Sequence, residues 1–513
     1  MNTSQDRCHN RKKTFLIRGT GTIIVAFWLV MMGALVLKNT ANNTDYSIDN
    51  KTKNKIAAET KIREPERAWM EVFLNRKKIG YSVNQIQPLD TGYAIHDTLF
   101  LHLNLLGRPS LIRSETQALV DNNFRLKHFR FSMRSGFTHF EITGEVGREE
   151  LIIKRKGSPD RKMRLEGPLF LGASLNYYFR RTDLELGKSF RIPFFDPSTL
   201  SRKTIVIRIS GREKIRIHGI QYKTLRLETE IMGQPAFFWL DDKGNILKET
   251  GLLGMTLVRS NPSQASKNIS GGGGDFYELV SLKPDRGLPR PRHLTYLKLN
   301  LKGLEETSFD TTVLSGERQH YHRNGDLEVI AEDLPASGSY SPPYTNPSEE
   351  IGKYLIPELT IESDDPGVQN MAREIAGAER DPVRVARRLM TWVYLKVDKR
   401  PVVSVPSAKE VLEKLVGDCN EHAVLLAALL RASRIPARVC AGLVYVKGRF
   451  YYHAWTEGYL GRWLSMDATL NQMPADATHI TLARGNLESQ TAIIALFGKL
   501  KIKVLNYKYD RTD

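Results

Sequence analysis

Cysteine is scarce in this chain, since its 513 residues include only three cysteines. Three cysteines are too few for a disulfide scaffold and for most zinc modules. The sequence also lacks an internal repeat and a calcium loop of the EF-hand type. We therefore expect neither a repeat architecture nor a disulfide framework, and no metal or other cofactor.

The chain also has no unusually high or low fraction of hydrophobic or charged residues. Hydrophobic residues make up 41 % and charged residues 26 %, which excludes a fully disordered chain and a polytopic membrane protein. The length allows about two to four domains. An excess of 75 Lys+Arg over 57 Asp+Glu gives a net charge of +18, which suits anionic partners such as a membrane surface or envelope polymers. Signals of the common nucleic-acid-binding modules are absent, so we expect no nucleic-acid partner.

Only one hydrophobic run is long enough to cross a membrane. Residues 19–37 carry no formal charge and would form a helix of roughly 28 Å. Basic side chains are concentrated in residues 1–18, which predicts a cytoplasmic N-terminus with the bulk of the chain periplasmic or extracellular. The alternative is a cleaved signal peptide, but its apolar core is usually about 7–15 residues long, and residues 38–41 make a poor cleavage site. We expect an uncleaved single-span anchor.

After this segment the composition and the hydrophobic pattern of the chain change several times. Residues 38–63 are polar and predict a flexible tether. Residues 64–260 alternate with a period of two, which predicts a mainly antiparallel β domain, and the runs FFWL and ILKET within it predict a hairpin. Residues 261–275 form a Gly-rich loop by composition, and residues 276–345 are a β connector or a second β layer.

The last third begins with helical patterns. Two Asp-Pro pairs, at 365–366 and 381–382, place an N-cap before a proline at the first helical position, and Ser407 with Glu410 predicts a capping box. Strand patterns follow Pro436. We expect an α+β domain over 346–495 and a C-terminal tail over 496–513.

Cys419 stands at the start of a predicted helix. It precedes the run AVLLAALLRAS, which has no Gly or Pro and favours a long buried helix. The unpaired N–H groups and the dipole at a helix N-terminus stabilise a thiolate. Cys419 therefore has the environment that a nucleophile needs.

A thiolate nucleophile also needs a proton carrier. His453 lies in a strand-like run, and Asp467 follows the next predicted strand. A two-residue turn between these strands would place Asp467 opposite Thr456, on the wrong face for His453. We therefore predict an odd-length connection or a bulge between Leu460 and Trp463.

These motifs resemble the core of the transglutaminase-like superfamily. The motifs GDC, IPARV, HAW and DAT occur in order within residues 350–490. The resemblance implies a papain-like fold in which Cys419 is the nucleophile, His453 the general base and acid, and Asp467 the group that orients the imidazolium. The chain departs from the usual pattern at residues 456–458 and at Ala468, and neither departure removes one of these groups. The preceding β-rich region resembles that of some bacterial membrane-anchored members.

Other assignments of nearby residues remain open. His422 could serve as the base on the first helical turn, and Cys419, His422 and His453 could bind zinc, although the ligand set is incomplete. Cys440 is expected to pack in the sheet, with pairing to Cys419 as an alternative. Trp392 is expected in the core rather than as an oxyanion donor. His479, which lies near Asp476 in the sequence, is expected to be a structural hydrogen-bonding residue rather than a second catalytic base.

The predicted function is cysteine-dependent acyl transfer on amide bonds through a thioester on Cys419. The acyl group would pass to water in a protease or amidase, or to an amine in cross-linking. The expected substrate is a protein, a peptide or a wall peptide. Two rival hypotheses are an inactive module that binds a peptide or glycan, and an envelope interaction protein whose β domain does the main work.

Overall fold

The structure is a computed structural model that describes residues 62–136, 138–231, 233–251, 254–271, 274–307, 309–335, 348–485 and 487–509. The predicted anchor at 19–37 and nearly all of the predicted tether lie outside these residues. Within the described part of the chain, no helix is both long and apolar enough to cross a membrane.

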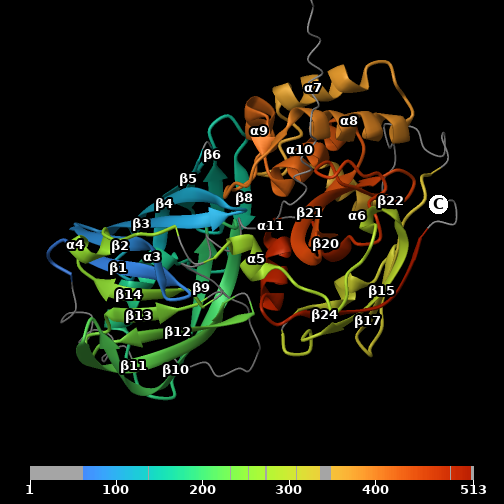
Figure 1. The fold of residues 1–513 in the computed structure, drawn as a ribbon. Helices are drawn as coiled ribbons and strands as arrows, with labels where there is room; N and C mark the ends of the chain where they lie inside the picture. The colour runs from blue at the N-terminus through green and yellow to red at the C-terminus, as the bar shows by residue number, and fades with distance from the viewer. Residues whose placement is uncertain are drawn as a thin grey trace, which may run out of the picture.

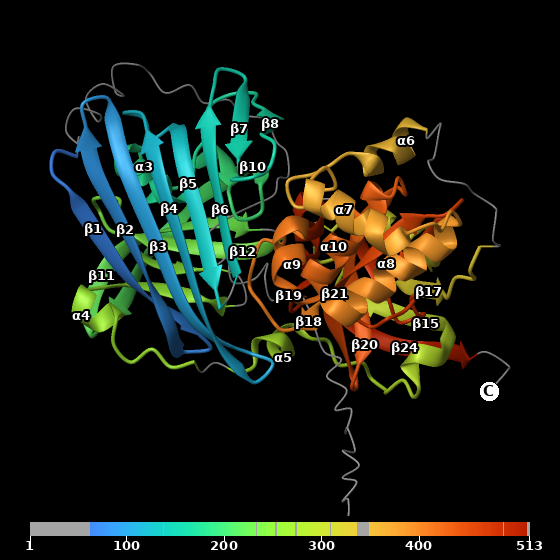
Figure 2. The ribbon, with the colours of Figure 1, turned by 90° about the horizontal axis from the view of Figure 1, so that it is seen from above.

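The first half of the described chain forms one fourteen-stranded antiparallel sheet (Figure 1). The chain begins with β1 in the middle of the sheet and adds strands outward to β8 at one edge. It then forms β9 at the other edge and adds strands inward to β14, which pairs with β1. The sheet curls so that the early strands lie in front of the later ones (Figure 2). Its strands are β1 (Glu66–Leu74), β2 (Lys77–Leu89), β3 (Gly92–Leu105), β4 (Arg108–Val120), β5 (Leu126–Ser135), β6 (Thr138–Val146), β7 (Glu150–Lys154), β8 (Arg161–Arg164), β9 (Ser189–Asp196), β10 (Ser201–Ile217), β11 (Ile220–Ile231), β12 (Gln234–Leu240), β13 (Ile246–Thr250) and β14 (Thr256–Ser260).

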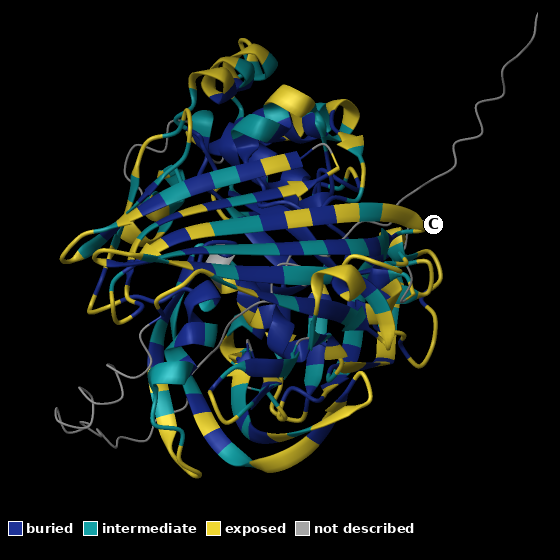
Figure 3. Ribbon diagram, turned by 90° about the vertical axis from the view of Figure 1, so that its left-hand side faces the viewer, coloured by how far each residue is buried: buried dark blue, intermediate teal, exposed yellow. Residues whose placement is uncertain are grey.

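The period of two predicted for this region is confirmed. In β5, Phe129, Phe131 and Met133 are buried, whereas Arg130 and Arg134, which alternate with them, are exposed. The same banding runs along the neighbouring strands (Figure 3). The predicted hairpin is formed by β12 and β13, whose turn is closed by Asp241. Inside the curl, α3 (Gly172–Tyr178) adds Tyr177 to an aromatic stack.

A second, four-stranded sheet joins distant parts of the chain. Its order is β16-β17-β15-β24, and β24 comes from the region for which the sequence predicted a tail. Ile502 and Val504 are buried there between exposed lysines, so the segment completes the edge of β15. The strands are β15 (Leu294–Lys302), β16 (Gln319–Tyr321), β17 (Asp326–Ile330) and β24 (Lys501–Tyr509).

Helices and a third sheet build the C-terminal α+β region. Helix α10 packs against β20 and β21 and is covered by α7, α8 and α9 (Figures 1 and 2). The sheet order is β22-β21-β20-β23. The helices are α7 (Pro366–Ala376), α8 (Pro382–Lys396), α9 (Ala408–Lys414) and α10 (Cys419–Ala432), and the strands are β20 (Ala437–Val446), β21 (Arg449–Tyr459), β22 (Trp463–Met466) and β23 (Ile480–Arg484).

The predicted helix starts are confirmed by side-chain caps. Asp365 and Asp381 each accept hydrogen bonds from two backbone N–H groups of the first turn, and Ser407 accepts one from the N–H of Glu410. In a full capping box the Glu410 carboxylate would accept from the backbone N–H of Ser407. Here the carboxylate accepts from Lys414 and Arg155 instead.

Candidate active site

Cys419 is the first residue of α10. Asp418 is the N-cap, and its Oδ1 accepts from the N–H of Asn420 at 2.9 Å, while Oε2 of Glu421 accepts from the N–H of Asp418 at 2.9 Å. This reciprocal capping box fixes the start of the helix, and the D-x-x-E spacing in the sequence could have revealed it. Cys419 thus lies where helix N–H groups are not paired within the helix.

His453 lies in the middle of β21, opposite Gly442 of β20. The two strands are joined by Lys447 and Gly448, which both have positive φ as a tight hairpin turn requires. Helix α10 is attached to β21 near His453, because the hydroxyl of Thr456 donates to the carbonyl of Ala423 at 2.9 Å. The helix that begins with Cys419 and the strand that carries His453 are therefore held together.

Asp467 follows β22 on the face that carries His453. Tyr459 pairs with Trp463, so three residues connect β21 and β22, and the register continues with Thr456 opposite Met466. The prediction of an odd-length connection is confirmed. One residue further along, Asp467 lies level with Trp455, which shares the face of His453.

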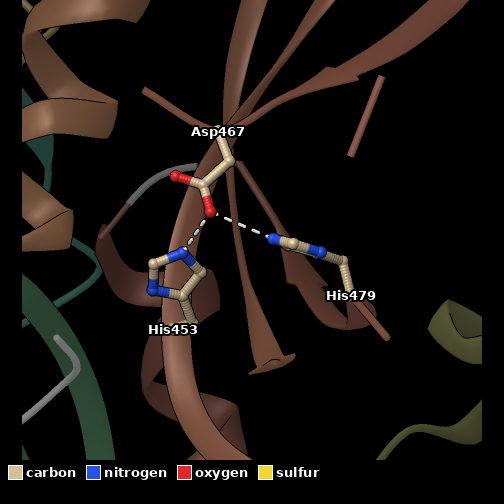
Figure 4. A group of neighbouring side chains, drawn as sticks. All are labelled: His453, Asp467 and His479. Carbon is tan, nitrogen blue, oxygen red and sulfur yellow. Dashed lines mark hydrogen bonds and ion pairs between the residues drawn. The ribbon is translucent and has the colours of Figure 1, made fainter. Parts of the chain in front are cut away.

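His453 and Asp467 form a direct hydrogen bond. Nε2 of His453 donates to Oδ2 of Asp467 at 2.6 Å, and both side chains are fully buried (Figure 4). Since the carboxylate fixes the proton on Nε2, the lone pair of a neutral His453 is on Nδ1. Among the described residues Nδ1 has no hydrogen-bond partner. This is the tautomer that a general base needs.

The environment keeps Asp467 ionised. Its Oδ1 accepts from the N–H groups of Thr469 and Leu470 at 2.7 and 3.0 Å. Burial alone would raise the pKa of Asp467, but its interactions with His453 and His479 lower it below the usual range. A charged carboxylate can stabilise an imidazolium on His453.

His479 is a third member of this group. Its Nε2 lies 3.0 Å from Oδ2 of Asp467, so that Asp467 stands between two imidazole rings (Figure 4). Its Nδ1 lies 3.3 Å from Oδ1 of Asp476, the acidic residue near it in the sequence. The contact with Asp467 was missed, because spacing along the chain does not indicate it.

His422 differs from His479 in its hydrogen-bond partners and in its charge. Nδ1 of His422 donates to the carbonyl of Asp418 at 2.6 Å, and Nε2 has no partner among the described residues. Burial and, to a smaller extent, the charge of Lys399 lower the pKa of His422 to about 4, although the bond to Asp418 and the charge of Asp467 oppose this effect. His422 is therefore neutral at pH 7.

The site is closed to solvent. Cys419, His453 and Asp467 each have 0 % of their surface exposed. Tyr277, on the short helix α5 (Phe276–Val280), is itself buried. Burial raises its pKa, and the negative charges of Asp418 and of an ionised Cys419 raise it further. Nothing in the sequence around Tyr277 indicated this interaction with the start of α10.

Metal ions in proteins are bound by groups of His, Cys, Asp and Glu side chains whose ligand atoms lie close together. Among the described residues one group of three, His453, Asp467 and His479, brings such atoms within 4.8 Å of one another. Both imidazoles already bond to Oδ2 of Asp467 at hydrogen-bond distances, so the group is complete without an ion. The alternative zinc set with Cys419 and His422 is not brought together in this way.

The remaining candidates lie where packing explains them. Cys440 is buried in β20 and is not in a disulfide with Cys419. Trp392 packs against the hydrophobic core from α8.

Comparison with known proteins divides the chain into two matched regions. Residues 71–259 match a protein family of unknown function, DUF3108, and residues 369–468 match the transglutaminase-like superfamily. No curated protein matches the chain. The second match contains Cys419, His453 and Asp467.

Two solved structures are similar to parts of the chain. A proposed cysteine protease from Cytophaga hutchinsonii has 19 % identity and a TM-score of 0.29, covering 43 % of this chain and 89 % of its own. A β-barrel-like DUF1849 protein from Brucella abortus has 12 % identity and a TM-score of 0.31, covering 39 % of this chain and 96 % of its own. The sequence match and the described architecture together identify the C-terminal region as a transglutaminase-like α+β domain, preceded by a mainly antiparallel β region.

Proposed function

We propose that this protein is a membrane-anchored enzyme that transfers acyl groups from amide bonds through a thioester on Cys419. The observation that carries the proposal is the bond from Nε2 of His453 to Asp467, which leaves Nδ1 as the basic nitrogen. Cys419 begins the helix that packs against the strand of His453. The same three residues lie inside the region matched to the transglutaminase-like superfamily.

The chemistry needs three protein groups. His453 takes the proton of the Cys419 thiol at Nδ1, and the thiolate attacks the carbonyl carbon of the amide. The C–N bond breaks, His453 returns its proton to the leaving amine, and a thioester remains. Water or a second amine then attacks the thioester, loses a proton to His453 and restores the thiol. Asp467 stabilises the imidazolium, and the N–H of Cys419 is a donor for the oxyanion.

The burial of the site has a direct consequence for this mechanism. A thiol with no exposed surface does not meet a substrate until the residues above it move. The same observation favours a second candidate, an inactive transglutaminase-like module that binds a peptide or glycan of the cell envelope.

The segment 19–37 supports a single-pass anchor, with the described domains on the far side of the membrane from a basic N-terminus. The substrate would then be a protein, peptide or wall peptide of that compartment. Anionic lipid or envelope polymers would lie next to a chain of net charge +18.

Alkylation of the full-length protein separates the two candidates. Iodoacetamide is added at pH 7, and the rate at each cysteine is followed by peptide mass spectrometry. In the enzyme, Cys419 reacts at least about 10-fold faster than glutathione, and His453→Ala removes that advantage. Cys440 is the internal reference, because burial raises the pKa of its thiol well above the usual range.

A Cys419 that reacts no faster than glutathione would contradict the enzyme and favour the binding module. For a reactive Cys419, ammonia release and peptide cleavage are then measured on glutamine-containing peptides, with and without a primary amine. Amine incorporation identifies cross-linking, and cleavage without it identifies a protease. Cys419→Ala must abolish either activity.

A further inference from the structure

His479 lies between two buried carboxylates. Nε2 is 3.0 Å from Oδ2 of Asp467, and Nδ1 is 3.3 Å from Oδ1 of Asp476. The side chains of His479 and Asp467 have no exposed surface, and that of Asp476 is 5 % exposed. Water therefore does not compete for these contacts.

Both carboxylates are surrounded by donors. Asp467 accepts two backbone N–H groups on Oδ1. Asp476 accepts the N–H and the hydroxyl of Thr478 on Oδ1, at 2.8 and 2.6 Å, and the amide of Gln472 on Oδ2 at 2.7 Å. A carboxyl group whose partners are all donors is held in its ionised, acceptor-only form.

This arrangement fixes the protonation of His479. A neutral imidazole has a single N–H and could donate to only one of the two carboxylates, whereas an imidazolium donates to both. Burial alone would lower the pKa of His479, but Asp476 and Asp467 raise it to about 9. The geometry and the electrostatics agree on a charged ring at pH 7.

We propose that His479 is a positioning residue: a permanent imidazolium, held by Asp476, that fixes the Asp467 carboxylate on His453 and offsets part of its charge. The role rests on the proposed function of Cys419 and His453, because it acts through Asp467 rather than on substrate. Asp467 is thereby shared by two imidazoles whose ring centres are 5.7 Å apart.

Other charged groups near the cluster are few. Lys399 and His422 each interact electrostatically with Asp467, and Arg318 donates to the backbone carbonyl of Asp476 at 2.8 Å. His422 is neutral at pH 7, and Arg318 also pairs with Glu332. His479 is the positive charge that bonds directly to both carboxylates.

The charge has a measurable effect on the thiol–imidazole pair. A positive His479 repels a second positive charge on the neighbouring ring, so it disfavours the pair of a Cys419 thiolate and a His453 imidazolium. His479→Gln keeps a hydrogen-bond donor but removes the charge. His479→Leu removes both, and Asp476→Asn removes the carboxylate that holds the charge.

The test measures the rate of Cys419 alkylation by iodoacetamide between pH 5 and pH 10 in the full-length protein. We expect the upper inflection of the profile to move up by about 1 pH unit in His479→Gln and in the same direction in Asp476→Asn. His479→Leu should in addition lower the plateau rate of Cys419 alkylation by about 10-fold. His96→Gln, in β3 of the other region, should reproduce the parent curve.

Nitrogen chemical shifts of histidine rings, from selectively labelled protein, give a second readout that does not depend on reactivity. His479 should be doubly protonated at pH 7.5, and a singly protonated ring overturns the proposal. A reactive parent whose inflection is unchanged in folded His479→Gln and Asp476→Asn also overturns it, while the proposed function stands. A parent that reacts like glutathione contradicts the proposed function and, with it, any catalytic role of His479.

Discussion

Gly442 shows how tightly single residues are constrained around the site. It lies opposite His453, and a Cβ atom there would be 1.9 Å from the carbonyl oxygen of Ile480. That oxygen belongs to the backbone and cannot move without shifting β23. We expect Gly442→Ala to lower the free energy of unfolding by about 2–4 kcal/mol, measured by urea denaturation.

Gly458, on the neighbouring strand, is the matched control. A Cβ atom there would lie 2.4 Å from Cε of Met466, the end of a flexible side chain. Because that methyl group can rotate away, Gly458→Ala should cost at most about 1 kcal/mol. An equal loss of unfolding free energy in the two variants would show that the backbone contact at Gly442 does not cause the destabilisation.

At the scale of elements, α5 connects the two halves of the protein above Cys419. Asp275 caps the helix through the N–H of Tyr277 at 2.9 Å and also accepts from the N–H of Gly107 in the β3–β4 turn at 2.6 Å. After the helix, Leu282 exchanges two backbone hydrogen bonds with Phe450 of β21. Because Tyr277 on this element interacts with Cys419, we expect movement of the element to expose the thiol.

Asp275→Ala tests that movement. Loss of a helix cap costs about 1 kcal/mol, so the open form should become about 5-fold more populated and Cys419 should be alkylated about 5-fold faster. Asp121→Ala is the control, because Asp121 closes a similar turn in the β region through the N–H groups of Asn123 and Arg125. An unchanged rate in Asp275→Ala would mean that another element covers the site.

Elements with local signals could be predicted from the sequence. The caps of α7 and α8 and the odd connection before Trp463 depend on residues close together in the chain. Tyr277 lies far from Cys419 in sequence, and no local pattern connects them. The strand β24 was missed for the same reason, since its pairing with β15 spans most of the C-terminal half.

At the scale of the whole molecule, the β-rich region is attached to the transglutaminase-like domain by specific contacts. Arg155, at the end of β7, donates to Glu362 at 2.7 Å and to Glu410 at 3.4 Å. On another side, Lys203 of β10 donates to the hydroxyl of Thr491 at 2.8 Å. The β-rich region is thus placed to influence α9 and the cover of the site.

Two buried histidines give the transglutaminase-like domain opposite responses to pH. The pKa of His422 is lowered to about 4, so the unfolded chain binds an extra proton between pH 4 and 6.5 and stability falls as the pH falls. The pKa of His479 is raised to about 9, so the folded chain holds the extra proton between pH 6.5 and 9 and stability falls as the pH rises. Their combined contribution to the stability of the folded chain is greatest near pH 6.5.

Each histidine should change the free energy of unfolding by about 3.5 kcal/mol on its side of that maximum, from roughly 2.5 pH units at about 1.4 kcal/mol each. The measurement is urea unfolding from pH 4 to pH 9.5, followed by circular dichroism at a helix wavelength that reports α7 to α10. Compared with the parent, His422→Asn should flatten the acid side alone, because Asn keeps a donor near the position of Nδ1 without a titratable ring. His479→Gln should flatten the alkaline side alone. Variant curves that run parallel to the parent on both sides would mean that these two rings do not set the pH dependence of folding.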